Sequence, residues 1–172
     1  MKKIFIGIAV VVIVTLFATF KFNQSKVVQS APKTEYKTYR NSRFGYEVQY
    51  PKEFKVENIS DNNADAIISN KESKIVTYAM FNSDHQNTKE LFDLFEKDHL
   101  KVKPTYQKIT KNFYVISYKE GNNIVYTYFK LGKLSYNGVT VTYPAKKQNK
   151  YGPMVEHIYK TFKTPYLDKE YE

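Results

Sequence analysis

Cysteine is absent from the 172 residues, and no motif of a known catalytic site takes its place. Without cysteine the chain forms no disulfide, uses no thiolate, offers no Cys-ligated zinc site and carries no lipid on an N-terminal cysteine. It has six glycines, and no phosphate-cradling glycine loop, G-x-S-x-G, zincin or Ser-x-x-Lys motif occurs. The histidines, His85, His99 and His157, lack metal-binding spacing. We therefore expect no enzyme activity, no cofactor and no metal site.

The apolar material that is present suffices for one packed core. Hydrophobic residues make up 42% of the chain and charged residues 26%, which is the composition of a folded protein and not of a disordered one. A mass of 20.2 kDa allows one domain of ordinary size plus a short extra segment. A large multidomain enzyme is excluded.

Residues 1–20 are expected to be a membrane anchor or a signal segment. After Lys2 and Lys3, residues 4–20 (IFIGIAVVVIVTLFATF) carry no charge, and as a helix they would measure roughly 26 Å, close to the ~30 Å hydrocarbon layer. We favour a single uncleaved transmembrane helix over a cleaved signal peptide, because Phe20 stands where a signal peptidase needs a small residue. Either reading exports the rest of the chain.

The exported part divides into a linker and a domain. Residues 21–37 (KFNQSKVVQSAPKTEYK) are polar and lack an apolar period, which is typical of a flexible linker. Residues 38–172 form the predicted domain. The expected location is a cell membrane, with a single pass and the bulk of the chain extracytoplasmic, or secreted if the N-terminal segment is cleaved.

Short alternating runs predict a mostly antiparallel sheet within the domain. Their separation by hairpin-length turns favours antiparallel pairing. Residues 75–81 are apolar on both faces and are expected to be a central strand that is covered above and below. Asn137-Gly138 is expected to be a bulge or a tight turn in the last strand. The expected strands are 46–50, 54–56, 66–69, 75–81, 113–118, 124–131 and 134–143.

Two helices are predicted beside these strands. Asn87 and Glu90 have the spacing of a capping box, so a helix should begin there. Near the end of the chain, apolar residues recur at helical spacing from Met154 to Phe162, with Pro153 expected in the first turn. Together these patterns predict an α+β domain of layered sheet and helices, preceded by the single N-terminal transmembrane helix.

Two segments of the domain resemble the PsbP-like family. Residues 39–51 (YRNSRFGYEVQYP) are similar to the family's opening pattern y-N-x-r-f-G-f-x-i-x-Y-P. Residues 139–144 (VTVTYP) and 151–162 (YGPMVEHIYKTF) resemble its closing strand, Y-P, spacer, helix and S-F. Thr161 replaces the usual serine, and Phe54 stands where a tryptophan often follows the first Y-P.

The resemblance implies an antiparallel sheet sandwiched between helices, a fold shared with a photosystem oxygen-evolving subunit and with a nuclear-import protein that binds a small GTPase. Many bacterial members are membrane-attached extracytoplasmic proteins without an established activity. What the family's members share is binding to protein partners and not catalysis. No partner-binding residue of the family can be placed on this chain.

Basic residues supply the candidate binding site. The chain carries 27 Lys and Arg against 17 Asp and Glu, a net charge of +10, and residues 38–172 keep 21 basic and 16 acidic residues, or +5. This diffuse charge argues against nucleic acid as a partner. Local concentrations could meet an anionic wall polymer, an anionic lipid or an acidic partner. The candidate residues are Lys101, Lys103, Lys146, Lys147 and Lys150.

Two functions are therefore expected. The first is a non-enzymatic binding or assembly module that is tethered outside the plasma membrane of a Gram-positive bacterium and contacts another envelope protein. The second is a basic adaptor for anionic wall polymer or lipid. A charge-driven contact should weaken steeply with salt, whereas a packed protein interface should not.

Overall fold

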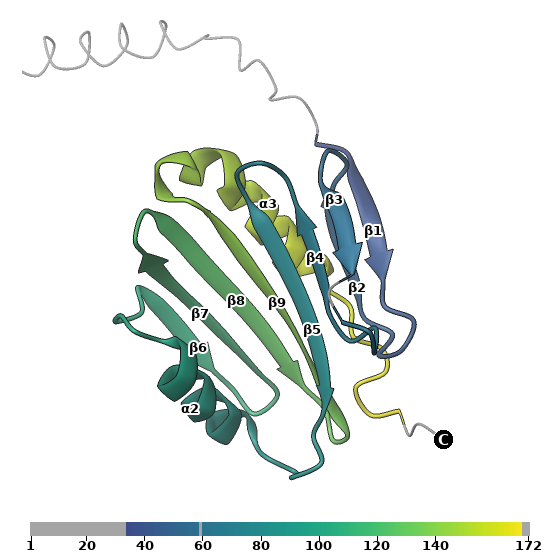
Figure 1. The fold of residues 1–172 in the computed structure, drawn as a ribbon. Helices are drawn as coiled ribbons and strands as arrows, with labels where there is room; N and C mark the ends of the chain where they lie inside the picture. Colours follow the sequence, from purple (N-terminus) through teal and green to yellow (C-terminus); the bar gives the residue numbers. More distant parts are fainter. Residues whose placement is uncertain (1–33, 59, 170–172) are drawn as a thin grey trace, which may run out of the picture. The chain divides into compact units, whose positions relative to one another are not determined.

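A computed structural model describes residues 34–58 and 60–169, and a compact unit spans Glu35–Glu172. Figure 1 shows the strands and helices. The strands are β1 (Tyr36–Arg40), β2 (Glu47–Pro51), β3 (Lys55–Asn58), β4 (Ala66–Ser69), β5 (Lys74–Phe81), β6 (Tyr106–Ile109), β7 (Phe113–Glu120), β8 (Asn123–Leu131) and β9 (Ser135–Pro144). The helices are α2 (Thr88–His99), the 3₁₀ turn η1 (Ala145–Lys147) and α3 (Gln148–Thr161).

The sheet is antiparallel throughout its described strands, as the hairpin-length turns predict. Seven strands pair in the order β3-β4-β5-β9-β8-β7-β6, and β1 and β2 form a separate hairpin. Pro51 and Pro144 are the last residues of β2 and β9, because proline has no N–H to extend a ladder. Gly45, in the β1–β2 turn, has a φ of 67°, which favours glycine.

One side of the seven-stranded sheet, which we name the α3 face, is covered over its central strands. It carries Ile68, Ile75, Val139 and Val141, which pack against α3 and against the β1–β2 hairpin. Tyr46, directly before β2, reaches into this core, where its hydroxyl lies 3.0 Å from Thr77 Oγ1 and donates to the Ala64 carbonyl at 3.1 Å. This face is the main core of the domain.

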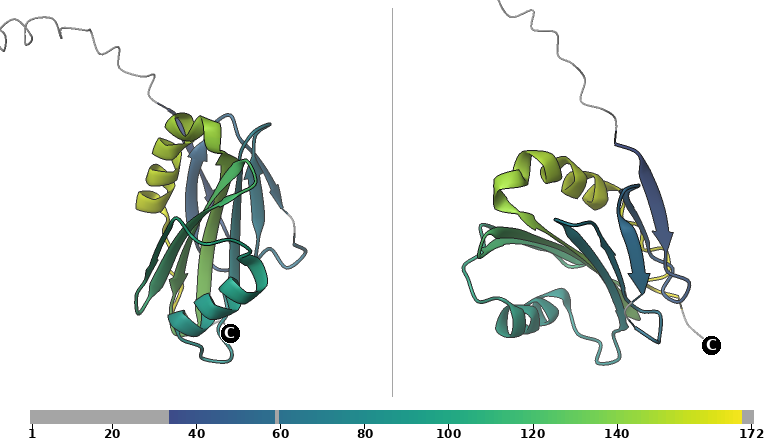
Figure 2. Two further views of the ribbon diagram at one scale, coloured as in Figure 1. Left: turned by 90° about the vertical axis from the view of Figure 1, so that its left-hand side faces the viewer. Right: turned by 45° about the horizontal axis from the view of Figure 1, so that its top comes forward.

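The other side, the α2 face, carries Tyr78, Tyr114, Phe129 and Tyr136 and packs against α2. Figure 2 shows α2 and α3 on opposite sides of the sheet, so the expected sandwich of sheet and helices is confirmed. The expectation that β5 is covered on both sides is wrong for its far end. Ile75, Thr77 and Ala79 on its α3 face are buried, but on the α2 face Met80 is 58% exposed, because the larger contacts of α2 are with β6 and β7.

Both predicted helices are present. Asn87 caps α2: its side chain accepts from the Lys89 and Glu90 amides, and Glu90 accepts from the Asn87 amide, which confirms the capping box. α3 begins at Gln148, earlier than expected, so Pro153 lies inside the helix and not in its first turn. The early start follows from η1, which leads directly into α3.

Asn137-Gly138 forms neither a bulge nor a turn. Both residues continue the β9 ladder, with Gly138 opposite Tyr78 of β5 and Phe129 of β8. A Cβ at position 138 would lie 2.1 Å from Cζ of Tyr78. The glycine is therefore needed because the Tyr78 ring occupies the space that a side chain at position 138 would fill.

The first strand begins two residues before the expected start of the domain at residue 38, within the expected linker. β1 begins at Tyr36, so Tyr36 and Lys37 pair with Pro51 and Tyr50 of β2. The expected anchor, residues 1–20, lies outside the described residues. Within residues 34–58 and 60–169, neither helix has the length and apolar character that crossing a bilayer requires.

Candidate binding surfaces

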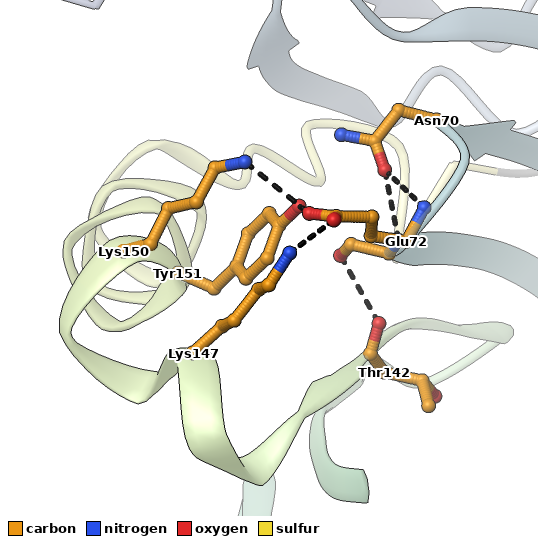
Figure 3. Close-up of polar contacts among 7 residues, drawn as sticks. Asn70, Glu72, Thr142, Lys147, Lys150 and Tyr151 are labelled. Carbon is orange, nitrogen blue, oxygen red and sulfur yellow. Dashed lines mark hydrogen bonds and ion pairs between the residues drawn. The ribbon is translucent and has the colours of Figure 1, made fainter.

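The five candidate lysines lie in two segments. Lys101 and Lys103 are exposed in the loop between α2 and β6. Lys146 is exposed on η1, and Lys147 and Lys150 follow it. Lys147 and Lys150 both contact Glu72, in the turn between β4 and β5 (Figure 3). Glu72 therefore balances part of the positive charge that the sequence assigns to this segment.

Glu72 is the centre of a polar cluster. Its Oε1 forms an ion pair with Lys147, and its Oε2 accepts from the Tyr151 hydroxyl at 2.8 Å and from Lys150 Nζ at 3.3 Å. Asn70 Oδ1 accepts from the Glu72 amide at 2.9 Å and fixes the turn. Hydrogen bonds from Lys147, Tyr151 and Lys150 lower the pKa of Glu72 to about 2. The cluster ties the β4–β5 turn to α3, which is a structural role.

A cleft of about 480 Å³ lies on the α2 face. Small residues of β8 and β9 create its floor: Thr127 is opposite Thr140 in the ladder. Rings and α2 residues surround the floor, and Leu94 at the rim is 45% exposed. Residues lining the cleft are Tyr78, Gln86, Leu91, Leu94, Phe95, Asp98, His99, Tyr114, Tyr118, Thr127, Phe129, Tyr136 and Thr140.

The hydroxyls of the cleft are neutral. Thr127 Oγ1 and Thr140 Oγ1 share a hydrogen bond of 2.9 Å. Burial raises the pKa of Tyr78 to about 12, and burial also raises the pKa of Tyr114 and of Tyr136. The tyrosines therefore stay protonated at neutral pH, where each hydroxyl can donate and accept a hydrogen bond.

Sequence reasoning missed this cleft because strand alternation alone does not distinguish an aromatic ring packed in a core from one that lines a hollow. Many of the aromatic residues do lie in the two cores. The available signal was the alternation of valine and threonine in residues 139–142, which places short hydroxyl side chains on one face of a central strand.

An arginine and three aromatic residues form a second surface, which we name the Arg43 surface. Arg43 Cζ lies 5.2 Å from the centroid of the Phe44 ring and 5.5 Å from that of Phe81. The two rings are 5.0 Å apart. Tyr166 covers Gly45, whose Cβ, if present, would lie 2.0 Å from the ring. Arg43, Phe81 and Tyr166 are exposed.

The histidines lie apart from one another. His99 is at the cleft, whereas His157 stacks on Tyr36 with ring centroids 3.6 Å apart and hydrogen-bonds Gln49 at 2.7 Å. His157 is therefore half-buried, and burial lowers its pKa. Among the described residues, no three His, Asp or Glu side chains are grouped so as to hold a metal ion.

Comparison with known proteins bears on the fold. The seven-stranded antiparallel sheet between α2 and α3 is similar to the solution structure of cyanobacterial PsbP (CyanoP) from Synechocystis sp. PCC 6803, with a TM-score of 0.58. The fold is PsbP-like. The match covers 78% of this chain and 95% of the cyanobacterial chain at 7% sequence identity, so this likeness concerns the fold alone. No family model and no curated protein sequence matches the chain.

Proposed function

We propose that this chain is a non-enzymatic binding or assembly module that contacts another protein of the bacterial envelope. Residues 1–20 tether it to the membrane, and the PsbP-like domain lies outside the cell, in a Gram-positive envelope. The proposed membrane tether and the proposed location outside the cell both rest on the apolar run of residues 4–20.

The observation that carries the proposal is the Arg43 surface. Arginine and tyrosine are enriched at the centres of protein interfaces, where they combine apolar contact area with hydrogen bonding. Arg43 is already held in place, because its Nη1 donates to the Asn62 carbonyl at 3.0 Å and its guanidinium lies over two rings. A side chain that is ordered before binding loses less conformational entropy when a partner arrives.

The chemistry of the buried hydroxyls also favours binding over catalysis. A general acid or base works best when its pKa lies near the operating pH. The cleft tyrosines have raised pKa values, that of Tyr78 being about 12. Such groups are suited to hydrogen bonding and not to proton transfer at neutral pH.

The second candidate is a basic adaptor for an anionic wall polymer or lipid. It rests on Lys101, Lys103 and Lys146, which are exposed. Glu72 neutralises part of the charge of Lys147 and Lys150, which counts against this candidate. An adaptor of this kind should release its ligand between low and physiological salt.

Photo-crosslinking of the full-length chain in intact cells tests the proposal. A benzoylphenylalanine at Tyr166, which is 40% exposed, is compared with one at Tyr159 of α3, which is 39% exposed. We expect one discrete envelope-protein adduct from position 166, its loss in Arg43→Glu, and no such adduct from position 159. Equal labelling from the two positions, or adducts that disappear with a wash at physiological salt, would contradict the proposal.

A further inference from the structure

The cleft on the α2 face exists because of a local change in side-chain size. Thr140 of β9 and Thr127 of β8 are short, and the longer rings of Tyr78, Tyr114 and Phe129 line the cleft beside them. The cleft volume of about 480 Å³ falls within the range of about 300–1,000 Å³ that is typical of small-molecule sites.

Its walls are rigid aromatic rings. Tyr114 and Phe129 stack with centroids 4.5 Å apart and planes 9° apart, and Phe129 also contacts Tyr136 at 5.1 Å. Phe95 of α2 packs on Tyr114 at 5.9 Å. Tyr114 and Phe129 are each 2% exposed, so the ring surface open to a ligand is that of Phe95, Tyr78 and Tyr136, which are half-buried. The C–H face of a ligand ring can pack against such surfaces.

Its floor offers hydroxyls. Thr127 is fully buried and shares its hydrogen bond with Thr140, which is half-buried. The Tyr136 hydroxyl donates to Met80 Sδ at 2.9 Å, and thus to a weak acceptor. Threonine and tyrosine hydroxyls can both donate and accept, as the hydroxyls of a sugar do, so the two sets can pair in either direction.

Fixed charge is confined to the rim. Of the described lining residues, Asp98 and His99 are the ionisable groups other than tyrosine, and both are exposed at the end of α2. Among the described lining residues, an anionic ligand would find no buried cation on the floor. An apolar ligand would displace water from the hydroxyls and offer no hydrogen bonds in place of those that the water made. The lining therefore suits an uncharged ligand that has both a flat face and several hydroxyls.

We propose that the cleft between α2 and the sheet is a binding site for an uncharged pyranose saccharide of one or two rings. One face of the sugar packs on the aromatic walls, and its hydroxyls pair with those of Thr140, Tyr78 and Tyr136. This site is separate from the Arg43 surface, so each can be tested without the other.

Saturation-transfer NMR on the purified full-length chain tests this site. A polyoxyethylene detergent is used, because alkyl glycosides would themselves present a pyranose. The probes are glucose, N-acetylglucosamine, cellobiose and diacetylchitobiose. Sorbitol is the control for hydroxyls without a ring, and p-cresol is the control for a ring without several hydroxyls.

We expect saturation of the C–H protons of at least one saccharide and of neither control. Thr140→Leu, which fills the floor, should weaken binding at least about fivefold, the scale of one lost hydrogen bond. Thr142→Leu is the matched control, because Thr142 lies on the same face of β9 and does not line the cleft. This variant should bind as the unmodified chain does.

Tyr136→Phe provides a second test, because it removes one of the hydroxyls proposed to pair with the sugar and keeps the ring. It should also weaken binding at least about fivefold, even if Thr140→Leu fails to fold. The proposal would be overturned if no saccharide is saturated, if sorbitol or p-cresol is saturated as strongly, or if binding persists unchanged in Tyr136→Phe.

Discussion

The two faces of the same sheet are packed differently. On the α3 face, Val139 and Val141 of β9 meet a helix and a hairpin, and the core is closed. On the α2 face of that strand, Gly138 lies under the Tyr78 ring and Thr140 lines a cleft. The strand alternates between the two faces one residue at a time, so a single segment of sequence supplies both a packed core and a hollow with hydroxyls.

Some apolar side chains on the α2 side of the sheet are exposed to solvent and do not contribute to a packed core. Leu94 of α2 is 45% exposed and Met80 of β5 is 58% exposed, whereas Ile158 of α3, in the core on the other face, is 1% exposed. Residues on the closed face should therefore govern stability, and residues on the open face should affect binding with little change in stability.

The largest expected effect breaks the closed face. Ile158→Ala should lower the free energy of unfolding by about 2–5 kcal/mol, because it leaves a cavity in the core. Leu94→Ala, on the other helix, should change it by no more than about 0.5 kcal/mol, because the side chain is exposed. Denaturant unfolding of both variants measures the difference, and similar losses would show that the two faces do not differ.

A smaller effect is expected where the open face meets the sheet. Gly138→Ala should lower the free energy of unfolding by about 1–3 kcal/mol, because the new methyl overlaps the Tyr78 ring. Gly152→Ala is the matched control: nothing lies within 4 Å of a Cβ there, and alanine in a helix should stabilise by about 0.5–1 kcal/mol. Equal effects at the two glycines, read from denaturant melts, would contradict the contact with Tyr78.

The smallest expected effect concerns the tie between the β4–β5 turn and α3. The pKa of Glu72 is lowered in the fold, from 4.5 to about 2, so its contribution is present above about pH 4.5 and is lost as the pH falls through about 2. Glu72→Gln should therefore melt slightly below the unmodified chain at pH 7, and this difference should shrink over that window.

Thermal melts at several pH values measure the effect, which solvent screening keeps small because Glu72 is partly exposed. Glu53→Gln, at an exposed position, is the control. A gap between Glu72→Gln and the unmodified chain that stays constant from pH 7 to 2 would contradict the role of the carboxylate.

Local signals in the sequence predicted local structure well. The capping box at Asn87 and the strand ends at Pro51 and Pro144 depend on residues close in sequence, and all are confirmed. β1 and β6 were missed because they are short edge strands with mostly exposed side chains, so their apolar alternation is weak. Pairing with a neighbouring strand, and not sequence pattern, makes these segments strands.

The binding surfaces depend on contacts between distant residues, which the sequence does not display. Glu72 lies 75 residues before Lys147, so their pairing could not be inferred from the run of lysines. The sequence suggests a bulge or turn at Gly138, because the feature that requires a glycine there, the Tyr78 ring, is on another strand. The cleft likewise needs the register of β8 against β9, which places Thr127 beside Thr140.

Amide hydrogen exchange of the full-length chain compares the two faces most directly. The amides of residues 92–97 in α2 and of residues 154–159 in α3 can be followed in one experiment. The account predicts that α2 exchanges at least about tenfold faster, because a helix that covers an open face can separate locally without disrupting the main core. Equal protection of the two helices, or faster exchange in α3, would contradict the division into a closed face and an open one.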